Sequence, residues 1–221
     1  MAREHARTQP VSLFAAMASL SPVKPTSDLD WEGLWAPYDE GTYTTALDLL
    51  KPDDVVLDIG AGDLRFARQA ARRVRRVFAI ERSREVLSAG ASQDGDPENL
   101  TVLCADALTL PYPEGITVAV LLMRHCRHFK DYVARLRAAG CRRLITNARW
   151  GMDVECLPLD PQPPYWMAPG GWYACACGAV GFKVPPEGLP ADALDSTFSV
   201  EDCPACLASR VVPIALAGSR R

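Results

Sequence analysis

Residues 55–64 constrain the fold of this chain more than any other stretch. Four apolar residues and Asp58 form the run Val-Val-Leu-Asp-Ile, and Gly60 and Gly62 follow at once. A turn sequence precedes the run, and residues 65–71 after it are mostly good helix formers. The order is therefore strand, glycine turn and helix. Because glycine lets backbone N–H groups approach a ligand closely, the turn suits a nucleoside that bears a carboxylate or a phosphate.

The spacing Asp58-x-Gly60-x-Gly62 resembles motif I of the class I S-adenosylmethionine-dependent methyltransferases. That family often has a further glycine two residues on, where this chain has Leu64. A dinucleotide fingerprint, G-x-G-x-x-G, would need glycine at position 65, where Arg65 stands. The resemblance therefore favours S-adenosylmethionine as the cofactor. A nicotinamide enzyme that uses NAD, and a non-catalytic relative, stay open as alternatives.

Two further acids follow apolar stretches. Residues 74–80 lead to Glu81, and residues 100–105 lead to Asp106. In the resembled family, the first acid accepts hydrogen bonds from the ribose hydroxyls and the second binds the adenine amino group. Glu81 alone does not distinguish the cofactors, because NAD-binding folds place an acid at the same point. The cofactor site that the resemblance implies consists of Asp58, Gly60, Ala61, Gly62, Glu81, Arg82, Asp106, Ala107, Met123 and Tyr38.

The fourth expected strand, residues 116–123, is almost continuously apolar, as is typical of a strand buried on both faces. It leads into Arg124 and His125, at the sheet edge where open α/β folds bind ligands. His125 is the candidate general base, because imidazole has its ordinary pKa near neutrality. Arg124 is the candidate partner for an anionic group of the acceptor. The alternative is that the polar residues after this strand begin the next helix and face solvent.

The end of this strand lacks the Asn/Asp-Pro-Pro-aromatic tetrapeptide that amino-directed methyltransferases place there. Methylation of an exocyclic amine by that device is therefore disfavoured. A helix is expected over residues 130–140, followed by a fifth strand over residues 142–150. Asn147, Arg149 and Trp150 leave the carboxyl end of that strand and are expected close to the same pocket.

Residues 1–40 are expected to form an N-terminal arm and a lid, because prolines interrupt a short apolar segment and aromatic residues follow it. In the resembled family, the segment before motif I often folds over the cofactor. Trp31, Trp35, Tyr38 and Tyr43 are therefore candidate lid residues. The alternative is that they pack the helix of residues 41–50 against the sheet.

Four cysteines near the C-terminus form two close pairs, Cys175-Ala-Cys177 and Cys203-Pro-Ala-Cys206. Two such turns can bring four thiolates into a tetrahedron, with short strands formed by the neighbouring aromatic and β-branched residues. Zinc is the expected metal, and four thiolates make the site structural, since no position stays open. Iron and free thiols are the alternatives. The other cysteines, Cys104, Cys126, Cys141 and Cys156, are expected to be ordinary small buried residues.

Composition limits the remaining possibilities. The 221 residues carry a formal net charge of −3, so no global positive field draws the chain to nucleic acid or anionic lipid. The hydrophobic content of 48% is enough for a real core. No apolar run reaches the ~18 residues of a membrane helix. A cytoplasmic location is expected, with a secretory segment at residues 11–20 as the alternative. The sequence does not indicate an oligomeric state.

The expected fold class is α/β, a doubly wound Rossmann-like parallel sheet with an N-terminal helical lid and a small C-terminal metal ribbon. The expected domains are residues 1–40 (arm and lid), 41–155 (methyltransferase core) and 156–221 (cysteine-rich tail). The resemblance implies methyl transfer to an acceptor that the sequence leaves unidentified. A small molecule or a protein is slightly favoured over RNA. The RNA alternative draws on a four-cysteine ribbon found in some bacterial ribosomal RNA methyltransferases and on local arginines, Arg72, Arg73, Arg75, Arg76, Arg142 and Arg143.

Overall fold

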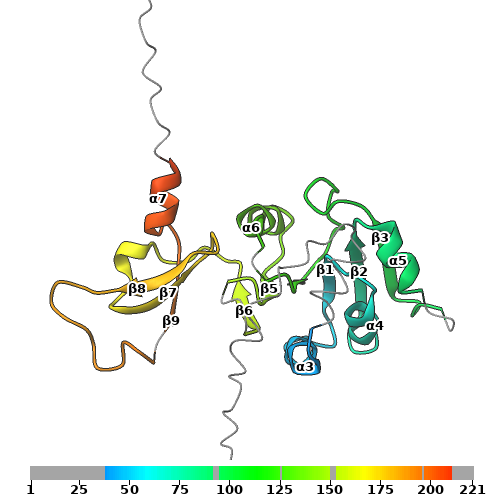
Figure 1. The fold of residues 1–221 in the computed structure, drawn as a ribbon, viewed down its shortest axis with the longest axis horizontal. Coiled ribbons are helices and arrows are strands. Elements are labelled where there is room, and N and C mark those ends of the chain that lie inside the picture. The colour runs from blue at the N-terminus through cyan, green and yellow to red at the C-terminus, as the bar shows by residue number, and fades with distance from the viewer. Residues whose placement is uncertain (1–37, 92–94, 125, 150–152, 196, 211–221) are drawn as a thin grey trace, which may run out of the picture.

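The computed structural model describes residues 38–91, 95–124, 126–149, 153–195 and 197–210. Its main element is a six-stranded sheet with the order β3-β2-β1-β4-β5-β6 (Figure 1). The first five strands pair in parallel, and β6 pairs antiparallel with β5. The chain reverses its direction across the sheet between β1 and β4, which confirms the doubly wound, Rossmann-like fold. The strands are β1 (Val55–Ile59), β2 (Arg76–Glu81), β3 (Leu100–Cys104), β4 (Val118–Leu121), β5 (Arg143–Thr146) and β6 (Glu155–Pro158).

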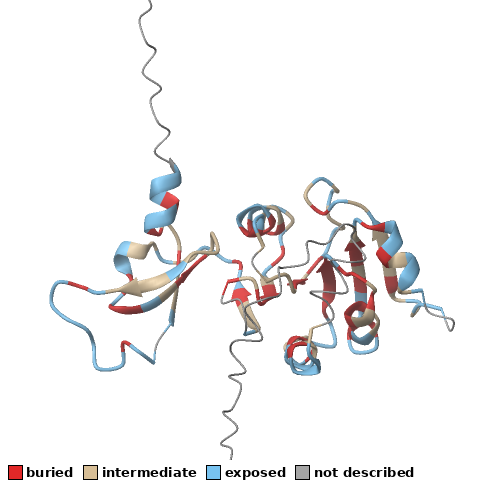
Figure 2. Cartoon of the chain, viewed as in Figure 1, coloured by how far each residue is buried: buried red, intermediate tan, exposed pale blue. Residues whose placement is uncertain are grey.

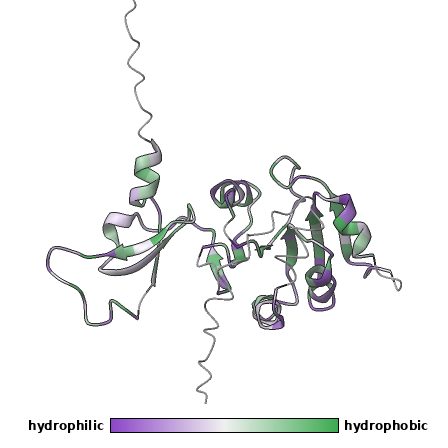
Figure 3. Cartoon of the chain, viewed as in Figure 1, coloured by the Kyte–Doolittle hydropathy of each residue, from purple (hydrophilic) through white to green (hydrophobic). Residues whose placement is uncertain are grey.

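Helices cover both faces of this sheet. On one face, α3 (Glu40–Asp48) and α4 (Arg65–Ala71) pack against an apolar cluster that includes Val56, Val120 and Ile145. On the other, α6 (Phe129–Ala138) packs against a cluster that includes Leu57 and Leu144. The remaining helix of this part, α5 (Arg84–Ala89), follows β2. The central strands are almost wholly buried (Figure 2) and strongly hydrophobic (Figure 3).

The sequence predicts at least five parallel strands, and β6 adds a sixth, antiparallel strand from the start of the cysteine-rich tail. Its residues pair with β5 from Arg143 opposite Pro158 to Thr146 opposite Glu155. The expected boundary between core and tail, after residue 155, falls inside this strand. The first residues of the tail therefore belong to the main sheet.

Asp54 connects the amino ends of β1, β4 and β5 through hydrogen bonds. Its buried carboxylate accepts hydrogen bonds from the Thr117 hydroxyl at 2.7 Å and from Arg143 at 2.6 and 2.8 Å. Burial alone would raise the pKa of Asp54, but these donors and the backbone N–H of Lys51 hold it below its ordinary value. Open α/β sheets bind ligands at the opposite edge, at the carboxyl ends of the strands.

The C-terminal unit, here called the ribbon (residues 165–210), is a second, smaller sheet with the order β8-β7-β9. Its aromatic and β-branched residues form the short strands that the sequence predicts. It also packs on the main sheet, since Arg137 of α6 donates to Glu201 at 2.6 Å and Gly178 lies beside the Phe129 ring. The elements are η1 (Tyr165–Met167), β7 (Gly171–Cys175), β8 (Val180–Lys183), β9 (Thr197–Val200) and α7 (Pro204–Arg210).

Several expected features lie outside the described residues. They are the arm, the lid residues Trp31 and Trp35, the candidate base His125, and Trp150. Within the described part of the chain, none of the helices is long and apolar enough to span a membrane.

Candidate functional site

The glycine turn after β1 has the backbone that its sequence predicts. Gly60 and Gly62 have φ angles of 73° and 56°, in the left-handed region that favours glycine. The N–H groups of Gly60 and Ala61 both donate to the carbonyl of Ile80, at 2.9 and 3.0 Å. A Cβ atom added at Gly60 would come within 3.0 Å of the Met123 methyl group. The left-handed backbone therefore disfavours a side chain at this position, and a Cβ atom would also press on the Met123 methyl group.

Leu64 occupies the position where the resembled family often has a third glycine. Its φ of 69° is also left-handed, and its side chain is buried in the core. For leucine this backbone costs about 1–2 kcal/mol, which burial of the side chain offsets. The loop thus keeps the glycine-type path although the glycine is missing.

Glu81, at the end of β2, is held against this turn. Its carboxylate accepts hydrogen bonds from the N–H of Gly62 at 3.1 Å and from the N–H of Ser83 at 2.8 Å. A carboxylate has about four lone-pair sites, so two stay available to a ligand. The next residue, Arg82, is exposed. Two backbone donors therefore fix the orientation of Glu81, the acid that the resemblance assigns to the ribose of the cofactor.

Asp58 lies one strand away, and its carboxyl group is buried. The Oδ2 atom has no hydrogen-bond partner in the structure. Burial, followed by repulsion from Glu81, raises the pKa of Asp58 to about 7. A buried acid in this state suits a cationic group of a ligand, because such a group would stabilise the ionised form.

Asp106 follows β3 at the same edge of the sheet. The ends of β2 and β3 adjoin, since the N–H of Ala105 donates to the carbonyl of Glu81 at 3.0 Å. The exposed Asp106 carboxylate accepts from the N–H of Leu108 at 2.8 Å, and Ala107 is buried. Asp58, Glu81 and Asp106 therefore stand at one edge, on three adjacent strands.

Arg124, just beyond β4, meets the segment before α3. Its backbone N–H donates to the Tyr38 hydroxyl at 3.1 Å, and its guanidinium lies 4.7 Å from the centre of the Tyr38 ring. Asp39 is 4.0 Å from the same guanidinium. Tyr43 packs against Phe66 of α4, and its hydroxyl accepts a hydrogen bond from the backbone N–H of Tyr38 at 3.2 Å. Of the candidate lid residues that are described, only Tyr38 reaches the β4 end.

Two of the residues expected at the end of β5 are described, and both are buried. Arg149 pairs with Glu155 and donates to the carbonyl of Cys175 at 3.4 Å, so it joins β5, β6 and the ribbon. Asn147 has a relative exposure of 0%, and neither its Nδ2 nor its Oδ1 has a hydrogen-bond partner. The lack of a partner is a tertiary property, which no pattern in the sequence indicates.

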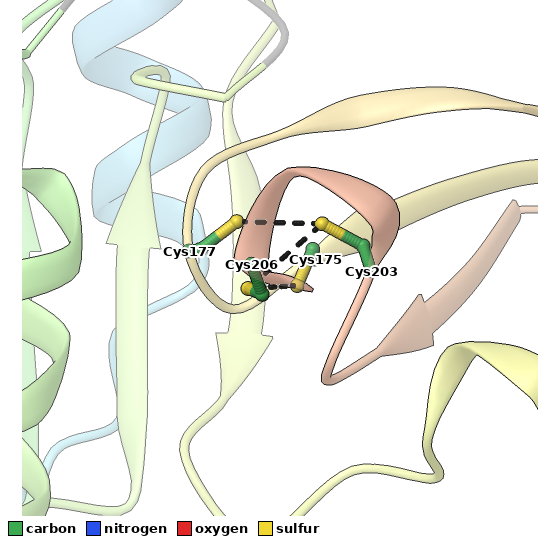
Figure 4. A group of neighbouring side chains, drawn as sticks. All are labelled: Cys175, Cys177, Cys203 and Cys206. Atoms are coloured by element: carbon green, nitrogen blue, oxygen red, sulfur yellow. Dashed lines mark hydrogen bonds between the residues drawn. The ribbon is translucent and has the colours of Figure 1, made fainter. Parts of the chain in front are cut away.

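The four cysteines of the two pairs come together in the ribbon (Figure 4). Their sulfur atoms all lie within 4.8 Å of one another. The closest pairs are Cys177 and Cys203 at 3.6 Å, Cys175 and Cys206 at 3.8 Å, and Cys203 and Cys206 at 3.9 Å. Four sulfurs about 2.3 Å from a central zinc ion would be about 3.8 Å apart, so the arrangement has the size of a tetrahedral thiolate site.

The neighbouring Cys177 thiol lowers the pKa of Cys175, as expected for thiols that share a small cluster.

The prediction for the other cysteines was wrong at one position, because Cys104 is exposed. Cys141 is buried, and Cys126 and Cys156 are partly buried.

Residues 56–147 match a family described as a methyltransferase domain. This stretch runs from β1 to the residue that follows β5. Two relatives bear the description probable ribosomal RNA small subunit methyltransferase A. The protein from Methanosarcina mazei is 24% identical over 183 residues, which are 73% of this chain and 65% of that protein. The protein from Methanosarcina acetivorans is 35% identical over 65 residues, which are 29% of this chain and 24% of that protein. The chain thus spans less than two thirds of either relative.

Solved structures with a similar arrangement include precorrin 8W decarboxylase from Methanobacterium thermoautotrophicum. It is 25% identical, with a TM-score of 0.44 over 50% of this chain and 63% of that chain. The 23S rRNA methyltransferase ErmE is 26% identical, with a TM-score of 0.40 over 49% of this chain and 46% of that chain. Both TM-scores are low, and the fold assignment rests on the strand order of this protein itself.

Proposed function

We propose that this protein transfers a methyl group from S-adenosylmethionine to an acceptor. The observation that carries the proposal is the Glu81 carboxylate, which is held by Gly62 and Ser83 inside the stretch that matches a methyltransferase domain. In this proposal Glu81 binds the ribose and Asp106 binds the adenine. Gly60, Ala61, Gly62 and Asp58 receive the amino-acid end of the cofactor, and Asp58 faces its ammonium group.

The chemistry asks mainly for alignment. The sulfonium of the bound cofactor supplies an electrophilic methyl carbon. A lone pair of the acceptor forms the new bond to that carbon, while the electrons of the breaking sulfur–carbon bond remain on sulfur. Any extra proton on the acceptor leaves to a base or to water. This chain has to hold both reactants in line and to exclude water, and His125 is the proposed base.

The first test measures the affinity for S-adenosylmethionine by calorimetry. Glu81→Ala removes a charged acceptor of hydrogen bonds, so we expect Kd to rise at least tenfold, about 1.4 kcal/mol. Glu85→Ala is the matched control, because Glu85 is an exposed acid at the start of α5. Equal affinities of Glu81→Ala and the unchanged protein would refute the assignment.

RNA is the acceptor class that the relatives favour, since both are described as ribosomal RNA methyltransferases. The sequence offers several arginines for contact with RNA. Two of them, Arg76 and Arg143, begin β2 and β5 at the amino edge of the sheet. The proposed cofactor site lies at the opposite edge, so these two arginines do not contribute to that site. Labelled methyl groups from the cofactor should be followed into RNA, protein and small-molecule fractions of a cell extract. Label in the protein or small-molecule fraction alone would instead support the acceptor class that the sequence slightly favours, a small molecule or a protein.

We also propose that the four cysteines bind one structural zinc ion. The support is the spacing of their sulfur atoms, which matches a closed tetrahedral site. Elemental analysis of the purified protein should find one zinc per chain, and Cys203→Ser should lower that content. Cys104→Ser is the control, because Cys104 is exposed and lies outside the cluster. Iron in place of zinc would support the alternative metal.

A further inference from the structure

One loop of the ribbon presents apolar and acidic side chains to solvent side by side. The loop of residues 184–195 lies between β8 and β9, and it contains three acids but no lysine or arginine. Its large apolar side chains are between 48% and 71% exposed, and its acids are exposed as well. The apolar residues are Val184, Leu189 and Leu194, and the acids are Glu187, Asp192 and Asp195. Exposed apolar side chains that gather in this way are typical of a surface that binds another molecule.

This loop is anchored on the ribbon. Backbone hydrogen bonds of 3.0–3.1 Å close three turns within it. Pro185 and Ala193 are buried, and they lie close to the chain just before and at the start of β7. A Cβ atom added at Gly170 would come within 2.6 Å of Pro185, and one at Gly171 within 2.7 Å of the Ala193 carbonyl oxygen. The loop therefore presents its leucines and acids from a defined backbone.

A surface of the opposite charge lies at the amino edge of the main sheet, between α4 and β2. Four of the five residues 72–76 are arginines, and all four are exposed. They are Arg72, Arg73, Arg75 and Arg76, here called the arginine surface. Arg73 pairs with Asp48 at 3.1 Å, and the Arg76 guanidinium lies 4.5 Å from the centre of the Phe78 ring.

A cavity of about 370 Å³ adjoins the arginine surface. It is lined by the apolar side chains of Val55 and Phe78, by Arg75 and Arg76, and by Glu114 and Gly115. The two arginines outweigh the single acid of this lining, so its net charge is positive. A cavity of this kind suits an apolar side chain that has carboxylates beside it, which is what the loop of residues 184–195 offers.

We propose that the loop of residues 184–195 of one copy binds the arginine surface and its cavity on a second copy of this chain. A leucine of the loop enters the cavity, and the acids of the loop face the arginines. The two surfaces do not meet within one copy, because the loop lies at one end of the longest axis of the molecule and β2 lies toward the other (Figure 1). The contact is head to tail, since it joins two different surfaces, and it therefore builds rings or open chains.

Charge and apolar exposure together favour a second copy over RNA as the partner. RNA would account for the arginine surface, but its phosphates would be repelled by the acids of the loop, and the exposed leucines would stay uncovered. A second copy accounts for both surfaces at once, because each surface supplies what the other lacks.

The first experiment is sedimentation velocity of the full chain, as purified, over a range of protein concentrations. At low salt the average mass should rise with concentration, and added salt should return it toward the monomer, because salt screens exposed charges. Asp192→Asn combined with Asp195→Asn should weaken the association by about tenfold or more. Arg75→Gln combined with Arg76→Gln should weaken it to a similar extent.

Arg84→Gln and Glu85→Gln are the matched controls, because both residues are exposed at the start of α5, away from the two surfaces. They change the net charge in the same two directions, and they should leave the association unchanged. Thermal unfolding of every variant should match that of the unchanged protein, since all the substituted side chains are exposed. A weaker association then reports the contact and not the fold.

Mixing the two double variants tests the direction of the contact. Each variant keeps one intact surface, so an equimolar mixture should form a dimer and nothing larger, although neither variant associates alone. Leu194→Ser tests the apolar part of the contact, because it keeps every charge. It should also weaken the association of the otherwise unchanged protein.

A protein that stays monomeric at every concentration would overturn the proposal, and so would an association that the double variants leave unchanged. A mixture of the two variants that stays monomeric would overturn the head-to-tail contact. If the protein were monomeric and bound an RNA oligonucleotide that Arg75→Gln with Arg76→Gln no longer binds, the arginine surface would be a nucleic-acid surface instead. Calorimetry with S-adenosylhomocysteine reports the proposed cofactor site separately, and all these variants should bind it as the unchanged protein does.

Discussion

Asp58 lies inside β1, where its carboxyl group is buried. In the folded protein its pKa is raised from 3.8 to about 7, first by burial and then by Glu81. The folded state therefore binds a proton more tightly than the unfolded state between those two pH values. Because the folded state holds this extra proton, the free energy of unfolding falls as pH rises from about 4 to about 7. Without its ligand, the fold is thus weakened at neutral pH by one of its own site residues.

Asp58→Asn should abolish this dependence, because the amide stays neutral at every pH. The difference in unfolding free energy between the variant and the unchanged protein should be near zero below pH 4. It should grow to at most about 4 kcal/mol above pH 7, in favour of the variant. Urea denaturation across this range measures the difference, and groups common to both proteins cancel. Parallel curves for the two proteins would contradict a raised pKa of Asp58.

At the residue scale, the positions that follow a local rule could be predicted from the sequence. Gly60 and Gly62 are required by the left-handed backbone, and Glu81 follows an apolar strand at a recognisable distance. Leu64 shows the limit of such rules, because tertiary burial keeps a leucine in a backbone that favours glycine. The missing partners of Asn147 and the exposure of Cys104 depend on the folded surroundings, so no local pattern indicates them.

At the scale of elements, long apolar runs predicted β1 and β4 to within two residues, but the sequence did not decide whether the tail adds a strand such as β6 to the sheet. The residues Glu155-Cys156-Leu157-Pro158 are few and end in proline, which is typical of a linker. They form a strand because β5 supplies a partner in register and because Pro158 falls at the end, on the edge of the sheet. A strand that exists through pairing alone cannot be found from its own residues.

The ion pair between Arg149 and Glu155 connects the ends of β5 and β6 and reaches the ribbon through Cys175. The side chain of Arg149 is only 2% exposed, so removing it leaves Glu155 without its counterion in a largely buried place. Arg149→Met should therefore lower the free energy of unfolding by about 3 kcal/mol. The double variant with Glu155→Leu should recover part of that loss, as a denaturation cycle measures. Additive losses would mean that the two side chains act independently.

At the scale of the whole molecule, the two sheets depend on different sources of stability. The main sheet has two large apolar clusters, one on each face. The buried apolar cluster of the ribbon contains five residues, and three of these are the cysteines Cys175, Cys203 and Cys206. The large apolar side chains that are exposed in the described part of the chain all belong to the ribbon, among them Trp166 and Leu194. We therefore expect the proposed zinc ion to supply much of the stability of the ribbon, because few of its apolar side chains are buried.

Removing the proposed zinc ion should unfold the ribbon and leave the main sheet folded. Hydrogen exchange with a chelator and a thiol reductant present should show loss of amide protection across residues 165–207, while β1 and β4 keep theirs. The change should stop near β6, because only a few contacts, such as those of Arg137 and Arg149, join the two parts. Cys203→Ser should give the same pattern without a chelator, and Cys104→Ser should not. Equal loss of protection in both sheets would show that the molecule unfolds as one unit. Unchanged protection in the ribbon would show that the cysteines hold it together without a metal.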